Sequence, residues 1–266
     1  ARASEALWYR GLIGRGFFDT PDGLEEFAYI PDDFLLILPQ KVAKPAAPGP
    51  LGRPATRAEK SCSVLADDKI LDDVCTMLAG RRIGMDLDAI QAHLISISES
   101  RYALDVQALE TLLVSAGLLD QEGQIILEPV RQFLEKTREA ALLELFRSWM
   151  SSQQFNELRL IPGIKIEGVW RNDPLSARQS ILDFLSTIPG RLPGGGEKPV
   201  FWSLNSFVNA VREIQPDFQR PSGDYDTWYL QDVDTGEYLR GFQNWDRVDG
   251  ELIRFTLCGP LHWLGL

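Results

Sequence analysis

The sequence predicts an α+β fold that is mainly α-helical with small β-hairpins, organised as a tandem of winged-helix modules. One observation is an internal repeat: Leu12 precedes Gly16 by four residues just as Leu113 precedes Gly117, and each copy then has a further glycine, Gly23 or Gly123. A second is that each copy continues into an apolar run that ends at Pro31 or Pro129. A third copy begins at Leu261–Leu266. Because internal repetition reflects one structural unit used several times, the repeat decides the predicted architecture.

The repeated segment predicts the end of a helix followed by a β-hairpin, the wing of a winged helix. A helix that buries Leu113 should end at Gly117, since glycine accepts the left-handed conformation that closes a helix. Residues 118–119 then enter a strand, the turn contains Gly123, and residues 124–127 return as the second strand. The first copy has Gly16 in the place of Gly117. An unrelated helix followed by an unrelated hairpin stays open as the alternative.

Composition limits the classes of function. The chain has 266 residues, enough for two ordinary domains, and a net charge of -11 that repels a polyanion on average. Any contact with DNA therefore needs a local basic patch. No apolar run approaches the ~20 residues that a membrane span needs. The cysteines, Cys62, Cys75 and Cys258, lack the spacing of a disulfide framework or a zinc site, which favours the cytoplasm.

The first part of the chain, residues 1–40, is predicted to be the last helix and the wing of a partial winged helix. The helix is expected over residues 4–18 with Trp8 on its buried side, and a short helix over residues 32–38 follows the wing. Since the chain opens and closes inside the repeat, we expect it to be a fragment of a longer protein. Residues 41–60 are rich in proline and glycine and are predicted to form a mobile linker.

Residues 61–137 are predicted to form a complete winged-helix module of three helices and a hairpin. The expected helix N-caps are Asp67 or Asp68, then Asp86 or Asp88, and then Asp105. Gly80 is expected to stop the first of these helices. A helix is predicted to start at Pro129 and to run through Trp149 as a brace between two domains. Residues 138–171 contain the rest of this bracing helix and a connector with short strands near Gly163.

Residues 172–266 are predicted to form a third winged-helix-like module that is truncated at its wing. Asp173, which is followed by a proline, and Ser203 are the expected N-caps of its first two helices. An inserted hairpin has its turn at residues 232–236. The last helix is expected over residues 248–257, ahead of a glycine–proline pair.

Motifs that would indicate an enzyme, a cofactor or a metal are weak. The glycines of residues 194–198 lack the spacing of a phosphate loop and favour a flexible loop. The aspartates of residues 224–234 fail the pattern of a calcium loop and are read as turn formers. His262 follows Cys258 by four residues, but other metal ligands are missing. Carboxylates are abundant without an organised catalytic set, so we expect no enzyme, no cofactor and no metal.

Tryptophans could stack on nucleic-acid bases or fill the core. Trp8, Trp149 and Trp263 sit among apolar residues and are predicted to be core, whereas Trp170 and Trp228 are less clearly buried. For DNA reading, the third helix of a module should carry basic side chains. The candidate nucleic-acid-binding residues are Arg10, Arg15, Arg101, Arg240, Arg247 and Arg254.

Four segments carry a resemblance to a known family. They are residues 29–33, 170–174, 236–242 and 259–265. In these segments the chain resembles large bacterial proteins described as helicase-associated, which are similar to the N-terminal domain of XPB-type helicases and contain several winged helices. The resemblance implies nucleic-acid association by name only, and no helicase motor motif is present in the sequence.

Two functional hypotheses follow. The first is a noncatalytic winged-helix protein that associates with DNA in transcription or repair, through Arg10, Arg15 and the hairpin around Arg240. The second keeps the fold but replaces DNA by a protein partner or by self-association, because the helix after Asp105 carries Glu110 and would repel phosphate.

Overall fold

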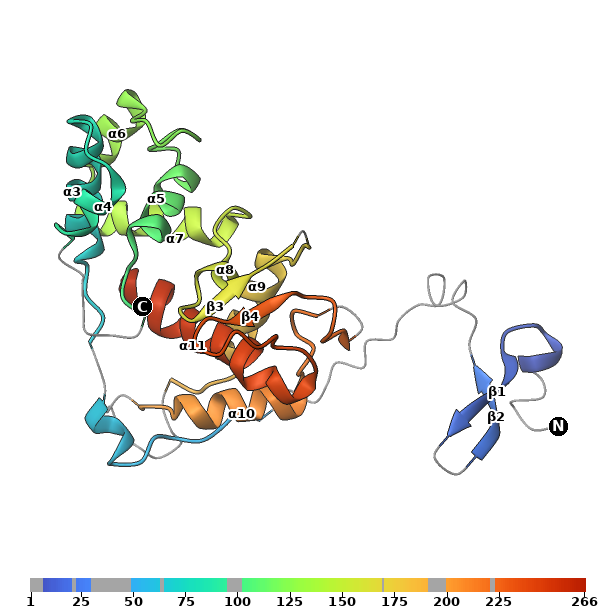
Figure 1. Cartoon of the computed structure of the whole chain (residues 1–266). Helices are drawn as coiled ribbons and strands as arrows, with labels where there is room; N and C mark the ends of the chain where they lie inside the picture. The colour runs from blue at the N-terminus through green and yellow to red at the C-terminus, as the bar shows by residue number, and fades with distance from the viewer. Residues whose placement is uncertain are drawn as a thin grey trace. The chain divides into compact units, whose positions relative to one another are not determined.

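The computed structural model describes residues 7–20, 23–29, 49–62, 65–94, 102–168, 170–190, 200–220 and 223–266. These residues belong to two units, one within Ala1–Pro48 and one within Gly49–Leu266 (Figure 1). Helices and small antiparallel two-stranded sheets make up the chain, which confirms the predicted α+β class. The arrangement into tandem winged-helix modules stays a prediction. Among the described helices, none is long and apolar enough to cross a membrane.

The first unit is a β-hairpin that follows a short helical turn. Strands β1 (Gly14–Thr20) and β2 (Gly23–Tyr29) pair antiparallel, with Gly14 opposite Tyr29. The hairpin was predicted, but the helix over residues 4–18 is wrong, because the helical turn of residues 7–9 ends at Gly11 with a φ of 68°. Trp8 is 41% exposed, so its assignment to a core is also wrong. The short helix predicted over residues 32–38 lies outside the described residues.

The second unit begins with three helices, α3 (Ile70–Arg82), α4 (Leu87–Gln91) and α5 (Val106–Ser115). Asp86 and Asp105 cap α4 and α5 as predicted, because each carboxylate accepts a backbone N–H of the first turn. Helix α3 instead has Lys69 as its N-cap. Gly80 does not stop it: a Cβ there would lie 2.6 Å from Ile90 Cγ1, so the glycine allows α3 to approach α4.

A short hairpin follows α5, as predicted. Leu119 bridges Ile125, and the backbone N–H of Ile126 donates to the Leu118 carbonyl at 3.0 Å. The single long helix predicted after it is wrong. Two helices, α6 (Leu127–Leu134) and α7 (Arg138–Ser151), are separated where the hydroxyl of Thr137 caps α7. The expected start at a proline is wrong as well, since α6 begins at Leu127 with Ile126 as its N-cap.

The apolar core of these helices is continuous. It contains Val74, Leu109 and Leu113, and it extends to Trp149 of α7 and to Leu261 near the end of the chain. We call it the first core. The burial of Trp149 confirms its predicted place in a core.

The rest of the second unit surrounds another core, the second core. Its elements are α8 (Glu157–Leu160), β3 (Ile164–Ile166), α9 (Pro174–Ser186), α10 (Leu204–Ile214) and β4 (Leu230–Asp232). Asp173 and Ser203 cap α9 and α10, as predicted. The inserted hairpin is also confirmed, since Gln231 bridges Tyr238, and β3 pairs with β4 as a further strand (Figure 1).

The last helix is longer than predicted. A π-helical turn, Asp246–Gly250, leads into α11 (Glu251–Thr256) and a second π-helical turn, Leu257–Leu261. The glycine–proline pair at residues 259–260 therefore does not end the helix; the wider π-helical hydrogen bonding accommodates Pro260 there. Because Leu252 lies in the second core and Leu261 in the first, this helix joins the two cores.

Three helix ends share one hydrogen-bond pattern, which corrects the register of the repeat. Gly11, Gly117 and Gly265 have φ values of 68°, 68° and 80°. In each case the next N–H donates to the carbonyl of a leucine five residues earlier, at 2.9, 2.9 and 3.0 Å. This is the Schellman motif. The glycine equivalent to Gly117 in the first copy is therefore Gly11, whereas Gly16 lies inside β1.

The described part of the predicted linker, residues 49–60, packs against the second core. Leu51 is buried in it, Pro54 forms a β-bridge with Trp202, and Glu59 accepts from the hydroxyl of Ser203. The sparse apolar content of this segment concealed the packing, because one leucine and hydrogen bonds of both backbone and side chains hold it.

Candidate interaction surface

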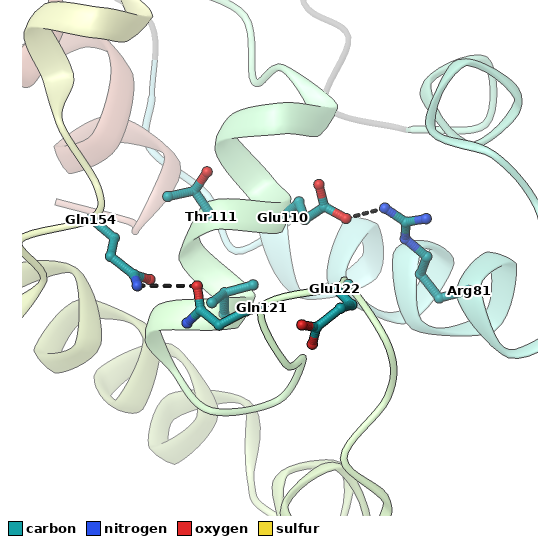
Figure 2. A pocket seen from close by; sticks show the side chains of 8 residues that line it. Arg81, Glu110, Thr111, Gln121, Glu122 and Gln154 are labelled. Carbon is teal, nitrogen blue, oxygen red and sulfur yellow. Dashed lines mark hydrogen bonds and ion pairs between the residues drawn. The ribbon is translucent and has the colours of Figure 1, made fainter. Parts of the chain in front are cut away.

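The surface of α5 and the following hairpin contains a polar hollow of about 570 Å³ (Figure 2). Under the winged-helix prediction, α5 is the third helix and the hairpin is the wing. The side chains labelled in Figure 2 are Arg81, Glu110, Thr111, Gln121, Glu122 and Gln154. They come from the end of α3, from α5, from the hairpin turn and from the segment after α7. We call this surface the α5 face.

Local structure places these side chains together. Gly123 adopts a φ of 74°, which lets the hairpin turn fold back onto α5. A Cβ at Gly123 would lie 2.6 Å from Glu110 Oε1, so a larger residue would displace the Glu110 carboxylate and strain the turn. Beside it, the guanidinium of Arg81 forms an ion pair with Glu110. This ion pair links α3 to α5 at the floor of the hollow.

The charges of the α5 face do not suit a polyanion. Arg81 is its one basic lining residue, and Glu110 already neutralises it. Glu122 is exposed at the hairpin turn, and Gln154 donates to Gln121 at 3.3 Å across the hollow. The surface therefore offers carboxylate and amide groups to a ligand. The carboxylate of Glu122 accepts hydrogen bonds from cationic or N–H donors and repels phosphate, while the glutamine amides both donate and accept.

Neither Arg81 nor its pairing with Glu110 was predicted from the sequence. The only signal was an arginine directly after Gly80, at the end of a helix that packs closely on its neighbour. A pairing between residues 29 positions apart has no local pattern.

Of the six arginines predicted to bind nucleic acid, two lie in the first unit. Arg10 is exposed next to Gly11. Arg15 lies over the ring of Trp8, with its guanidinium carbon 4.8 Å from the ring centre, and approaches Glu26 at 3.8 Å. Arg101 lies outside the described residues. The structure thus brings Arg10 and Arg15 into one small hairpin unit.

Two further arginines are bound by acids within the last helix and the inserted hairpin. Arg254 has a side chain only 18% exposed and pairs with Asp246 at 2.7 Å and Glu251 at 3.4 Å. Arg247 forms an ion pair with the buried Asp232 of β4. Their positive charges are largely compensated by the protein itself, which weakens any attraction of phosphate.

Arg240 has a different environment. Its guanidinium lies 4.9 Å from the ring centre of Tyr229 and 5.1 Å from that of Tyr238, and both rings are 45% exposed. The hydroxyl of Tyr238 donates to Glu167 at 2.7 Å, which raises the pKa of Tyr238. We call these residues the hairpin cluster. The two tyrosines were not predicted as partners of Arg240, although they lie on the two sides of the turn in the sequence.

Other tryptophans are used inside the protein. Trp170 and Trp228 stack with ring centres 5.0 Å apart, and the buried Arg220 lies 4.2 Å from the centre of Trp228. Trp263 contacts both cores and donates its indole N–H to the Tyr102 carbonyl at 2.9 Å, in agreement with its predicted core position. These rings are therefore not free to stack on bases.

The aspartates of residues 224–234 form turns, as predicted. Asp224 accepts the N–H of Asp226 at 3.0 Å, and Asp232 accepts the N–H of Asp234 at 2.9 Å. Across the ranges that the structure describes, no group of three or more histidine, cysteine, aspartate or glutamate side chains could hold a metal ion. The glycine-rich residues 194–198 lie outside these ranges.

Comparisons with protein-family models, with curated proteins and with solved structures returned no match. The resemblance to helicase-associated proteins therefore stays a prediction.

Proposed function

We propose that the chain is a noncatalytic interaction protein and that the α5 face binds a protein partner. The observation that carries the proposal is the ion pair of Arg81 with Glu110, which leaves the α5 face with carboxylate and amide groups and no uncompensated base among its lining residues. A partner that presents lysine, arginine or backbone N–H groups complements such a surface.

The acidic surroundings support the same choice. Nonspecific DNA affinity comes from lysines and arginines that replace the counterions of phosphates. Around the α5 face, Asp105 caps the helix and Asp120 accepts backbone N–H groups in the hairpin turn. A phosphate backbone placed here would meet carboxylates first.

Site-specific crosslinking tests the proposal. A photoreactive amino acid replaces Gln121 in the α5 face or, as a control, the exposed Gln179 on α9. We expect a discrete protein adduct from position 121 in cells. The adduct should be lost when Glu122→Lys is added. It should be retained when Glu135→Lys, on the adjoining segment, is added instead. Equal adducts from both positions, or adducts insensitive to Glu122→Lys, would contradict a specific partner at this surface.

DNA association, in transcription or repair, is the second candidate function, and the hairpin cluster favours it. Arg240 makes no ion pair in the part of the chain that the structure describes, and its two exposed tyrosine neighbours are of the kind that stack on bases. Fluorescence anisotropy with labelled single- and double-stranded oligonucleotides at low salt tests it. Binding that weakens with salt and is lost in Arg240→Ala, but kept in Arg247→Ala, would support this candidate; no binding at low salt would reject it.

A further inference from the structure

A second recess lies between α3 and α6, beside the returning strand of the short hairpin. Its volume is about 470 Å³. The apolar side chains that line it include Leu78, Ile125, Leu127, Val130 and Leu134. Helices α3 and α6 lie next to each other in Figure 1, so the recess follows the seam between two helices. We call it the α3–α6 groove.

The groove exposes large apolar side chains. Leu127 is 64% exposed and Leu134 is 54% exposed, at the two ends of α6. Between them Val130 and Phe133 are buried and hold α6 in the first core. Helix α6 is thus anchored by one side while its ends leave leucines in water, and exposed apolar surface of this kind is typical of a binding groove.

The charges of the α3–α6 groove are opposite to those of the α5 face. Arg82 and Arg131 line it, and no acidic residue does so among the described residues. Arg131 forms ion pairs with Glu128 at 2.7 Å and with Glu135 at 3.1 Å. Arg82 is exposed and forms no ion pair within the described part of the chain. Arg82 is therefore the uncompensated charge of the groove among the described residues, and it favours an acidic group on a ligand.

We propose that the α3–α6 groove binds an amphipathic helix of a partner protein, with its apolar stripe on Leu127 and Leu134 and acidic side chains beside Arg82. A seam between two helices accepts a third helix whose apolar residues recur at i, i+3, i+4 and i+7. The flanking acids of such a helix pair with Arg82, which has no competing carboxylate within the groove. This inference concerns a different surface from the α5 face. It rests on the proposed function only in the premise that residues 67–134 bind proteins.

Two synthetic helical peptides of roughly 18 residues, about five turns, provide the probe. Both carry the same leucine stripe, and the flanking positions are glutamate in one and lysine in the other. We expect the glutamate peptide to bind with a Kd at least about tenfold below that of the lysine peptide, at moderate salt. Cys75 lines the groove and is exposed, so its modification by a maleimide should slow when the glutamate peptide is bound.

Variants of the intact chain locate the binding. Leu127→Glu and Leu134→Glu should abolish it, whereas Leu143→Glu, at a leucine of α7 that is 46% exposed and lies outside the groove, should not. Arg82→Glu should reverse the preference toward the lysine peptide. Circular dichroism confirms that each variant is folded, which its exposed position favours.

The inference would be overturned if neither peptide bound, if both bound equally, or if Leu127→Glu left binding unchanged. It would also be overturned if light scattering showed a dimer that Leu127→Glu dissociates, because the occupant would then be a second copy of the chain. Glu122→Lys separates this proposal from the previous one: it should weaken the partner of the α5 face and leave peptide binding intact.

Discussion

The two cores of the second unit differ in where they keep their charges. Around the first core, ion pairs lie at the surface, as in Arg138 with Asp68 at 2.6 Å, where both side chains are about half exposed. Two pairs in the rest of the unit are buried: Arg220 with Asp249 at 2.9 Å in the second core, and Arg178 with Glu157 at 2.7 Å where the second core meets Trp149 of the first, and all four side chains are almost fully buried. The first core is therefore defined by apolar packing and the second by polar pairing as well.

The difference teaches what each region can present to a partner. Arg178 also donates to the carbonyls of residues 149, 150, 152 and 155, so it closes the end of α7 and ties that helix to α9. A guanidinium that is buried and hydrogen-bonded in this way is not available to bind a partner. The helices of the first core bury Asp73 of α3 but keep the ion pairs of Arg138 at the surface, and both the α5 face and the α3–α6 groove lie on these helices.

The largest effect is expected from Arg178→Met. Removing one partner of a buried ion pair leaves a buried charge uncompensated, which costs about 3–5 kcal/mol. Here the carbonyls at the end of α7 would lose their donor too. Denaturant unfolding monitored by circular dichroism measures the loss. A change below about 1 kcal/mol would show that water replaces the guanidinium and that the second core does not depend on this pair.

The stability of the first core should depend instead on the steric fit between its helices, and Gly80→Ala tests this. A Cβ at residue 80 would meet Ile90 Cγ1 at 2.6 Å, so α3 and α4 must separate. Overpacking of this kind costs about 1–3 kcal/mol. Gly190→Ala is the matched control, because a Cβ there meets no atom within 4 Å. Equal thermal unfolding midpoints for the two variants would contradict tight packing of α3 on α4.

Local features of the fold were predictable from the sequence, because their causes lie within a few residues. Asp86, Asp105, Asp173 and Ser203 cap helices as expected, since a cap needs only a side-chain oxygen and a following turn. The register of the repeat was wrong in the first copy because two glycines, Gly11 and Gly16, fit the pattern. Only backbone geometry shows that Gly11 is the left-handed one.

The candidate surfaces were less predictable, because they depend on contacts between distant residues. The acidic character of the helix after Asp105 was visible in the sequence. The ion pair of Arg81 with Glu110 and the close approach of Gly123 to Glu110 were not. Arginines that pair with acids inside the protein could also not be distinguished, from the sequence, from arginines that are free. Arg254 and Arg247 were counted as candidates for DNA, whereas acids up to 15 residues away hold them.

A smaller effect is expected from Arg138→Ala at the surface of the first core. The guanidinium joins Asp68 and Asp72 of the α3 region to α7, and it lowers the pKa of Asp68. Because the folded pKa is depressed, this stabilisation is present above the ordinary pKa of aspartate and is lost as the pH falls through the folded value. The wild-type advantage over Arg138→Ala in unfolding midpoint should shrink at acidic pH and at high salt. An advantage insensitive to both would mean that Arg138 acts through packing.

The smallest effect concerns the hairpin cluster, which lies over the second core but resembles the first in its exposed charges. Hydrogen bonds from Tyr238 and Lys165 lower the pKa of Glu167. In Tyr238→Phe one of these donors is gone, so the pKa of Glu167 should rise toward its ordinary value, as measured by NMR titration of the side-chain carboxyl carbon. Tyr229→Phe is the control: its ring contacts Arg240, and its hydrogen bond with Glu167 joins the Glu167 N–H to the Tyr229 carbonyl at 2.9 Å, which the substitution keeps. If Tyr238→Phe leaves the pKa of Glu167 unchanged, Tyr238 is not fixed to β3. The cluster would then be a loose pair of rings, without the rigid surface that base stacking requires.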